Sequence, residues 1–195
     1  HVFKTQGVDL DLFSSAVKLN TQYMHSIWYR IVLKRETTLK EVVEKLRAIG
    51  RDPASRVVLL AAEGRGFCAG VDIKELARDG KLITQVNRGC YEAFAAVYEC
   101  AVPVIAAVHG FCLGGGIGLV GNADVIIASD DATFGLPEVD RGALGAATHL
   151  ARLVPQHKMR AMVYTSAVAT AAELYHYGSV LRVVPRDELL AAARE

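Results

Sequence analysis

The strongest constraint on the fold is a set of three apolar runs with almost no polar interruption. They are "RVVLLAAEG", "VPVIAAVHG" and "ADVIIASDDATFG", at residues 56–64, 102–110 and 123–135. Such runs are typical of strands buried on both faces, because a strand with one solvated face alternates apolar and polar residues. Segments 37–50 and 83–101 instead space their apolar residues by three and four, as helices do, and Gly50 is expected to end the first of them. Strands alternating with helices predict an α/β fold.

The composition is that of one globular domain. The chain has 195 residues, 52% of them hydrophobic, and a formal net charge of +1, which leaves no basic surface for nucleic acid. Its four cysteines show no CxxC spacing, so we expect reduced thiols in a cytoplasmic protein and no metal site. Pro103, His109 and the glycines interrupt the most apolar region, and no signal peptide is evident, so we expect no membrane partner.

Three consecutive glycines, Gly114 to Gly116, follow the second apolar run. A phosphate-binding loop would need a Lys and a Ser or Thr after them, and neither is present. Gly116, Gly118 and Gly121 match the GxGxxG spacing of dinucleotide sites, but the acidic residue expected at the end of a following strand is missing. What remains is a strand-to-helix turn with outward N–H groups, which serves either close helix packing or an oxyanion site.

A second turn of this kind lies in "AEGRGFCAGVDIKEL", residues 62–76. It too ends a buried strand in glycines and precedes a helix. An acyl oxyanion hole requires two N–H donors, and two such turns supply one each. The pair of turns therefore predicts an oxyanion site, which neither turn would predict alone.

Four segments carry a resemblance to a known family: "GRGFCAGVDIKEL", "AVHGFCLGGGIGLVGNADVIIAS", "ATFGLPEVDRGALG" and "TAAELYHYGSVLRVVP". In this order and spacing they resemble the crotonase superfamily, the enoyl-CoA hydratases and isomerases. The resemblance implies an α/β fold of the crotonase type, a spiral of ββα units that acts on acyl-CoA thioesters. Coenzyme A would be part of the substrate, with no separate cofactor. Self-association as a trimer or a dimer of trimers is also implied.

The resemblance covers residues 38–195, which we expect to form the crotonase core. Residues 1–37 have weak periodicity and remain unassigned, and the family's first strand is not recognisable there. The chain begins at His1 and stops at Glu195 inside an Ala-rich pattern, so we expect a part of a longer protein, without the C-terminal helices of the family.

The resemblance also implies the residues of the site. In the family, the residue after an Ala-Gly pair and the middle glycine of the triplet donate the oxyanion N–H groups, which are Val71 and Gly115 here. The segment that starts at Val71 would line the groove for the acyl-pantetheine and adenine parts of the substrate. The substrate-binding residues expected on this basis are Ala69, Val71, Asp72, Ile73, Lys74 and Gly115, with Arg65 as a loop cation for a CoA phosphate.

Two carboxylates are the catalytic candidates. Hydratases of the family carry a Glu where this chain has Gly118, so water addition by two Glu residues is disfavoured. Glu138 retains the second carboxylate and Asp140 follows it closely, so the two are expected to repel and to raise one pKa. Asp140 could instead cap the helix expected near residue 142, which leaves open which carboxylate is the base. His109 and His149 are expected to be structural, and become candidates only if both carboxylates fail.

Within the family, "NRGC" and the segment from "AVYECAVPVIAAV" to "LARLVPQH" most resemble the ring-cleaving CoA hydrolases of bacterial steroid and cholesterol catabolism. The small Gly118 would leave room for a bulky bicyclic acyl group, whose ring would open by retro-Claisen C–C hydrolysis. Two alternatives remain open: an enoyl-CoA isomerase that uses the single Glu138, and a non-catalytic CoA-binding subunit of the same fold.

Overall fold

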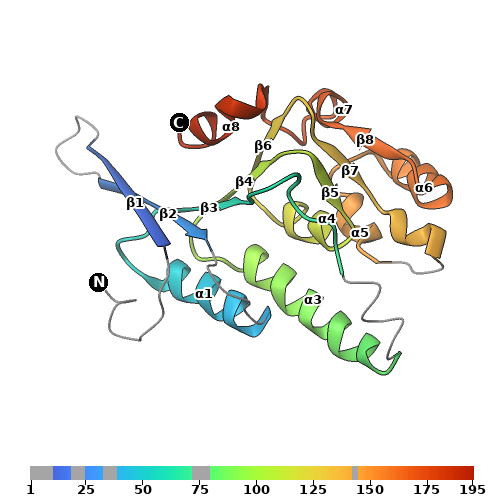
Figure 1. Ribbon diagram of the computed structural model, residues 1–195, viewed down its shortest axis with the longest axis horizontal. Coiled ribbons are helices and arrows are strands. Elements are labelled where there is room, and N and C mark those ends of the chain that lie inside the picture. Colours follow the sequence, from blue (N-terminus) through green and yellow to red (C-terminus); the bar gives the residue numbers. More distant parts are fainter. Residues whose placement is uncertain (1–10, 19–24, 33–38, 72–79, 142–144) are drawn as a thin grey trace.

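A computed structural model describes residues 11–18, 25–32, 39–71, 80–141 and 145–195. Its main element is a six-stranded sheet in the order β1-β2-β3-β4-β6-β9 (Figure 1). The strands are β1 (Asp11–Lys18), β2 (His25–Val32), β3 (Val57–Ala61), β4 (Val104–Val108), β6 (Val125–Ser129) and β9 (Arg182–Val184). β1 and β2 form an antiparallel pair at one edge, and every other neighbouring pair is parallel.

Helices cover both faces of this sheet, which explains why its central strands are apolar throughout. Successive residues of a strand point to opposite faces. Val58 packs in a cluster with residues of α1 (Leu39–Arg51) and α3 (Leu82–Tyr98), which lie side by side in Figure 1. Leu59, its neighbour, packs in another cluster with residues of α8 (Leu189–Ala192).

A smaller sheet packs in the largest apolar cluster, and its first strand leads into the glycine triplet. It contains β5 (Phe111–Leu113), β7 (Thr133–Gly135) and β8 (Val168–Thr170), in the order β5-β7-β8. Around it lie α4 (Gly115–Val120), α5 (Ala147–Leu150), α6 (Gln156–Thr165) and α7 (Ala171–His176), with the 3-10 turns η2 (Pro137–Arg141) and η3 (Arg186–Glu188). β4, β5 and α4 are consecutive and form one ββα unit, and β6 and β7 repeat its two strands.

The predicted α/β class is confirmed, and so are the three apolar strands and the two helices. Gly50 does not end the first helix, which continues to Arg51. A Cβ on Gly50 would lie 3.1 Å from the sulfur of Cys100, so this glycine permits close packing instead. The unassigned N-terminal segment contains β1 and β2, and β2 extends the sheet beside β3. Among the described helices, none is long and apolar enough to cross a membrane.

Candidate oxyanion site

Backbone hydrogen bonds join the two glycine turns. The N–H of Phe67 donates to the carbonyl oxygens of His109 (2.9 Å) and Phe111 (3.0 Å), and the N–H of Cys68 donates to Phe111 at 3.1 Å. In return, the N–H of Leu113 donates to the carbonyl of Cys68 at 2.8 Å. Residues 67–68 therefore run alongside β5. This pairing places the first glycine turn next to the second, as a shared oxyanion site would require.

Gly70 lies at the point of closest approach. Its φ of +90° belongs to the region that side chains rarely adopt. A Cβ there would stand 3.2 Å from both the nitrogen of Gly115 and the carbonyl oxygen of Leu113. Only glycine satisfies both conditions, so Gly70 is a geometric requirement of the junction.

Two backbone N–H groups of this junction, those of Val71 and Gly115, are the candidate oxyanion donors. Gly115 is the first residue of α4, where a backbone N–H has no partner within its own helix. In the described part of the chain, neither Gly115 nor Val71 donates a backbone hydrogen bond. Two unpaired donors on adjacent turns are the arrangement that holds an oxyanion.

Glu138 lies beside the triplet. Oε2 of its carboxylate is 3.3 Å from where a Cβ of Gly114 would stand, and Oε1 is 3.4 Å from the equivalent point on Gly145. Larger residues at either position would press against the carboxylate. Burial raises the pKa of the Glu138 carboxyl, although a backbone hydrogen bond opposes part of that rise. A carboxylate with a raised pKa beside two N–H donors is suited to accept a proton.

Asp140 points to a different neighbour. Its side chain is exposed and accepts a hydrogen bond of 2.7 Å from the hydroxyl of Ser166. It does not cap the following helix, because α5 has Ala146 at its N-cap and no side-chain cap. The pKa of Glu138 is raised by burial, and repulsion from Asp140 is not among the causes. The rise that was expected for one of the two pKa values therefore occurs at Glu138, and burial causes it instead of repulsion.

Gly118 does not leave an open space. A Cβ at this position would lie 2.1 Å from Cζ of Phe94, so the ring of Phe94 packs directly onto the glycine. The expectation that a small residue at 118 makes room for a bulky acyl group is wrong in this form. An aromatic ring from α3 occupies the place where hydratases of the family carry a carboxylate. This contact could not be predicted from the sequence, because Phe94 and Gly118 are 24 positions apart.

Two of the other predicted residues lie in the first turn. Arg65 and Ala69 are exposed on the segment between β3 and the junction. Asp72, Ile73 and Lys74 lie outside the described residues. His109 is 7% exposed, and its Nε2 lies 3.2 Å from the carbonyl oxygen of Gly64.

Arg186 contacts the first glycine turn, and this contact was not predicted from the sequence. Arg186, from η3, donates to the same carbonyl of Gly64 at 2.6 Å and pairs with Asp131 at 3.1 Å. Asp131 also accepts bonds from the hydroxyl of Ser129 and the N–H of Gly110, and the Ser129 bond is the main cause of its lowered pKa. Asp131 thus connects Arg186, which holds Gly64, with Gly110 between β4 and β5. No local pattern connects Arg186 with Gly64, because 122 positions separate them.

Comparison with known proteins agrees with this geometry. The family described as enoyl-CoA hydratase/isomerase matches residues 34–195. The chain belongs to this family. A solved enoyl-CoA hydratase from Mycobacterium smegmatis superposes with a TM-score of 0.80 at 26% identity, covering 94% of this chain and 73% of that one. The crotonase-type fold expected from the resemblance is thereby confirmed.

Two curated relatives share much of the sequence. Both are named (7aS)-7a-methyl-1,5-dioxo-2,3,5,6,7,7a-hexahydro-1H-indene-carboxyl-CoA hydrolase. The protein from Rhodococcus jostii is 66% identical over 80% of this chain and 61% of its own length. The protein from Mycobacterium tuberculosis is 63% identical over 78% of this chain and 63% of its own length. A mevalonyl-coenzyme A hydratase from Aspergillus fumigatus is 40% identical over 73% of this chain and 54% of its own. This chain therefore spans about three fifths of the length of the first two.

The raised pKa of Glu138 predicts a stability effect. A carboxyl whose pKa is higher in the folded state than in the unfolded state destabilises the fold once it is ionised, above the folded pKa. Glu138→Gln removes that charge, so at pH 7 its free energy of unfolding should exceed that of the native protein. The difference should shrink as the pH falls toward about 3, below the usual Glu pKa of about 4.3, where the native carboxyl is protonated in both states.

Urea unfolding across this pH range measures the effect. Glu188→Gln makes the same chemical change on an exposed side chain and should show no comparable pH dependence. A Glu138→Gln variant that is less stable than the native protein at pH 7 would mean that the carboxylate is stabilised by its surroundings.

Proposed function

We propose that the protein hydrolyses a ring C–C bond of a bicyclic, steroid-derived CoA thioester. The observation that carries this proposal is the 66% identity to a hydrolase of a hexahydroindene-carboxyl-CoA ester over 80% of the chain. The site supports it independently, because two unpaired N–H groups stand beside one partly buried carboxylate and the second hydratase carboxylate is replaced by Gly118. No cofactor is needed, since coenzyme A is part of the substrate.

The oxyanion junction accepts the charge that develops. The thioester carbonyl oxygen lies between the N–H groups of Val71 and Gly115. When a bond conjugated with that carbonyl breaks, its electron pair moves onto the oxygen, and both N–H groups bind the resulting enolate more strongly than the ground-state carbonyl. Each such donor contributes about 3–4 kcal/mol to lowering the barrier.

Glu138 activates water. Its carboxylate takes one proton from a water molecule, whose oxygen attacks a ring ketone. The C–C bond between the ketone carbon and the adjacent ring carbon then breaks, and the ring carbon receives the proton that Glu138 carries. One water is consumed, the ring opens to a carboxylate, and the thioester remains intact. Asp140 is exposed and bonded to Ser166, so it is the weaker candidate for the base.

The rest of the substrate would bind along the first turn. Ala69, Val71 and the predicted groove residues Asp72, Ile73 and Lys74 would hold the pantetheine and adenine parts. Arg65 is exposed on the preceding loop and would meet a CoA phosphate. Assembly as a trimer or a dimer of trimers and a cytoplasmic location complete the proposal.

Mass spectrometry separates this proposal from its alternatives. The protein is incubated with a methyl-dioxo-hexahydroindene-carboxyl-CoA ester and, separately, with a linear 3-enoyl-CoA. A ring hydrolase adds the mass of one water to the bicyclic ester. An isomerase, which a lone Glu138 would also permit, converts the linear ester at constant mass. A protein that binds both esters and changes neither would be a non-catalytic subunit, and either of the last two results would reject the hydrolase.

The oxyanion assignment predicts the effect of Gly115→Pro. Proline fits the first position of a helix, so the change removes one N–H with little demand on α4. The turnover number should fall at least about a hundredfold, as for the loss of one oxyanion donor. Gly115→Ala keeps the N–H, and its Cβ would be 3.6 Å from Cα of Gly70, an ordinary contact, so it should lose far less. Similar rates in the two variants would contradict the assignment.

The base assignment predicts an order of effects. Glu138→Gln keeps the shape of the side chain but cannot accept a proton, so turnover should fall by roughly a hundred- to ten-thousandfold. Asp140→Asn should cost less. Because burial raises the pKa of Glu138, the acidic limb of the rate profile should lie above the usual carboxyl range and should persist in Asp140→Asn. If Asp140→Asn is the more damaging change, the two carboxylates exchange roles.

A further inference from the structure

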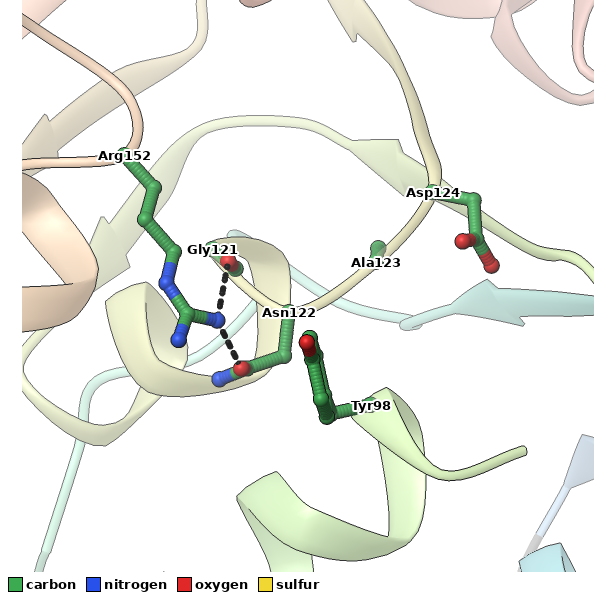
Figure 2. A pocket seen from close by; sticks show the side chains of 6 residues that line it. All are labelled: Tyr98, Gly121, Asn122, Ala123, Asp124 and Arg152. Carbon is green, nitrogen blue, oxygen red and sulfur yellow. Dashed lines mark hydrogen bonds between the residues drawn. The ribbon is translucent and has the colours of Figure 1, made fainter.

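A buried amide at the end of α4 links three side chains. Asn122 is 8% exposed, and its Nδ2 donates to the carbonyl oxygen of Gly118 at 2.5 Å. The same Nδ2 lies 2.9 Å from Nδ1 of His149. On the other side, Oδ1 accepts a hydrogen bond from Arg152, which also donates to the carbonyl of Gly121 (Figure 2). Arg152 in turn lies over the ring of Tyr98, 5.4 Å from its centroid.

This network determines the tautomer of His149. A guanidinium can only donate, so Arg152 requires the oxygen of the Asn122 amide to face it. The amide nitrogen must then face His149, where it donates to Nδ1. Nδ1 is therefore an acceptor, and the ring proton resides on Nε2. Burial, followed by the positive charge of Arg152, lowers the pKa of His149, so both effects favour this neutral form.

The Nε2–H group is left without a partner. Within the described part of the chain, Nε2 of His149 makes no hydrogen bond, and it is not one of the fully buried polar atoms that lack a partner. The ring of His149 meets the ring of Phe94 edge to face, with centroids 4.9 Å apart and planes at 68°. Phe94 is the residue that packs onto Gly118. A neutral donor therefore stands next to the aromatic surface that replaces the family carboxylate.

Phe94 and His149 both contact the segment that begins at the oxyanion candidate Gly115: Phe94 at Gly118 and His149 at Asn122. Gly115, Gly118 and Asn122 are spaced by three and four, so they share one face of the α4 helix and its C-terminal turn. At 1.5 Å per residue, Asn122 is on the order of 10 Å along the axis from the oxyanion donor. Glu138 lies beside Gly114, at the N-terminal end of α4. The ring of Phe94 covers the helix at Gly118, so an acyl group whose thioester oxygen is bound at Gly115 and which extends in the direction of α4 would pass over Phe94 and then meet His149.

We propose that Phe94 and His149 form the distal wall of the acyl pocket, and that the Nε2–H of His149 donates a hydrogen bond to a ring ketone of the bicyclic acyl group. The inference rests on the proposed function and names the specificity determinant of that site. A ketone oxygen is an acceptor without charge, which suits a neutral donor. A linear hydrocarbon chain offers no acceptor at this depth, so the contact would favour the ketone-bearing substrate. The aromatic face of Phe94 would support the ring carbons.

Paired substitutions distinguish this role from packing. Asparagine has its amide near the position of Nδ1, so His149→Asn retains a partner for Asn122 but loses the distal donor. Glutamine reaches the position of Nε2, so His149→Gln retains a distal donor but loses the acceptor for Asn122. If His149 determines specificity, His149→Asn should therefore lose more affinity than His149→Gln. If His149 is only structural, His149→Gln should lose more. His157→Asn, on an exposed residue of α6, is the matched control for the substitution itself.

Binding is measured by calorimetry in the Glu138→Gln background, so that no turnover interferes. The probes are the dioxo-hexahydroindene-carboxyl-CoA ester and the same bicyclic CoA ester with its ring ketones replaced by methylene groups. We expect His149→Asn to weaken the ketone-bearing ester about tenfold, the scale of one hydrogen bond to a buried donor. His149→Gln should weaken it less, His157→Asn should match the background, and the ketone-free ester should bind all variants alike.

Other outcomes overturn the inference. A greater loss in His149→Gln than in His149→Asn, or an equal loss for both esters, would mark His149 as a structural residue. Unchanged affinity in both variants would remove it from the pocket. Each of these results leaves the proposed function standing if the native protein adds water to the ketone-bearing ester. If the native protein adds no water to that ester, the proposed function fails, and this inference fails with it.

Discussion

The site depends on the backbone pairing between residues 67–68 and β5. The reciprocal hydrogen bonds of Cys68 with Phe111 and Leu113 bring two strand ends together that lie more than forty positions apart in the chain. Gly70 can then approach Gly115 closely, because it has no side chain and a φ of +90°. Without this pairing each turn would present one isolated N–H group. With it, the two turns lie side by side, as the proposed pair of oxyanion donors requires.

The surroundings of that junction serve to hold it in place. Arg186 and His109 both bond to the carbonyl of Gly64, at the start of the first turn. Asp131 binds Arg186 and the N–H of Gly110, so one carboxylate connects the C-terminal part of the chain with the segment between β4 and β5. The small sheet and its apolar cluster place Glu138 against the triplet. The rigidity of these elements is what keeps donors and carboxylate at fixed separations.

The two ends of α4 carry different polar groups. Beside Gly114, burial raises the pKa of the Glu138 carboxyl. At Asn122, an arginine and an amide hold a histidine in one neutral tautomer. Between them Phe94 provides an apolar surface over Gly118. A polar end, an apolar middle and a second polar end form a suitable profile for an acyl group with a thioester at one end and a ketone at the other.

The sequence alone determined the α/β class, the main strands and helices, the pair of glycine turns and the retained Glu138, because all of these rest on local periodicity or short motifs. It could not assign residues 1–37, whose periodicity is weak and where β1 and β2 pair antiparallel and β2 joins the sheet beside β3. The tertiary structure decided what fills the space at Gly118, which direction Asp140 faces and what anchors Gly64. Those contacts join residues 24 to 122 positions apart, and only packing brings such side chains together.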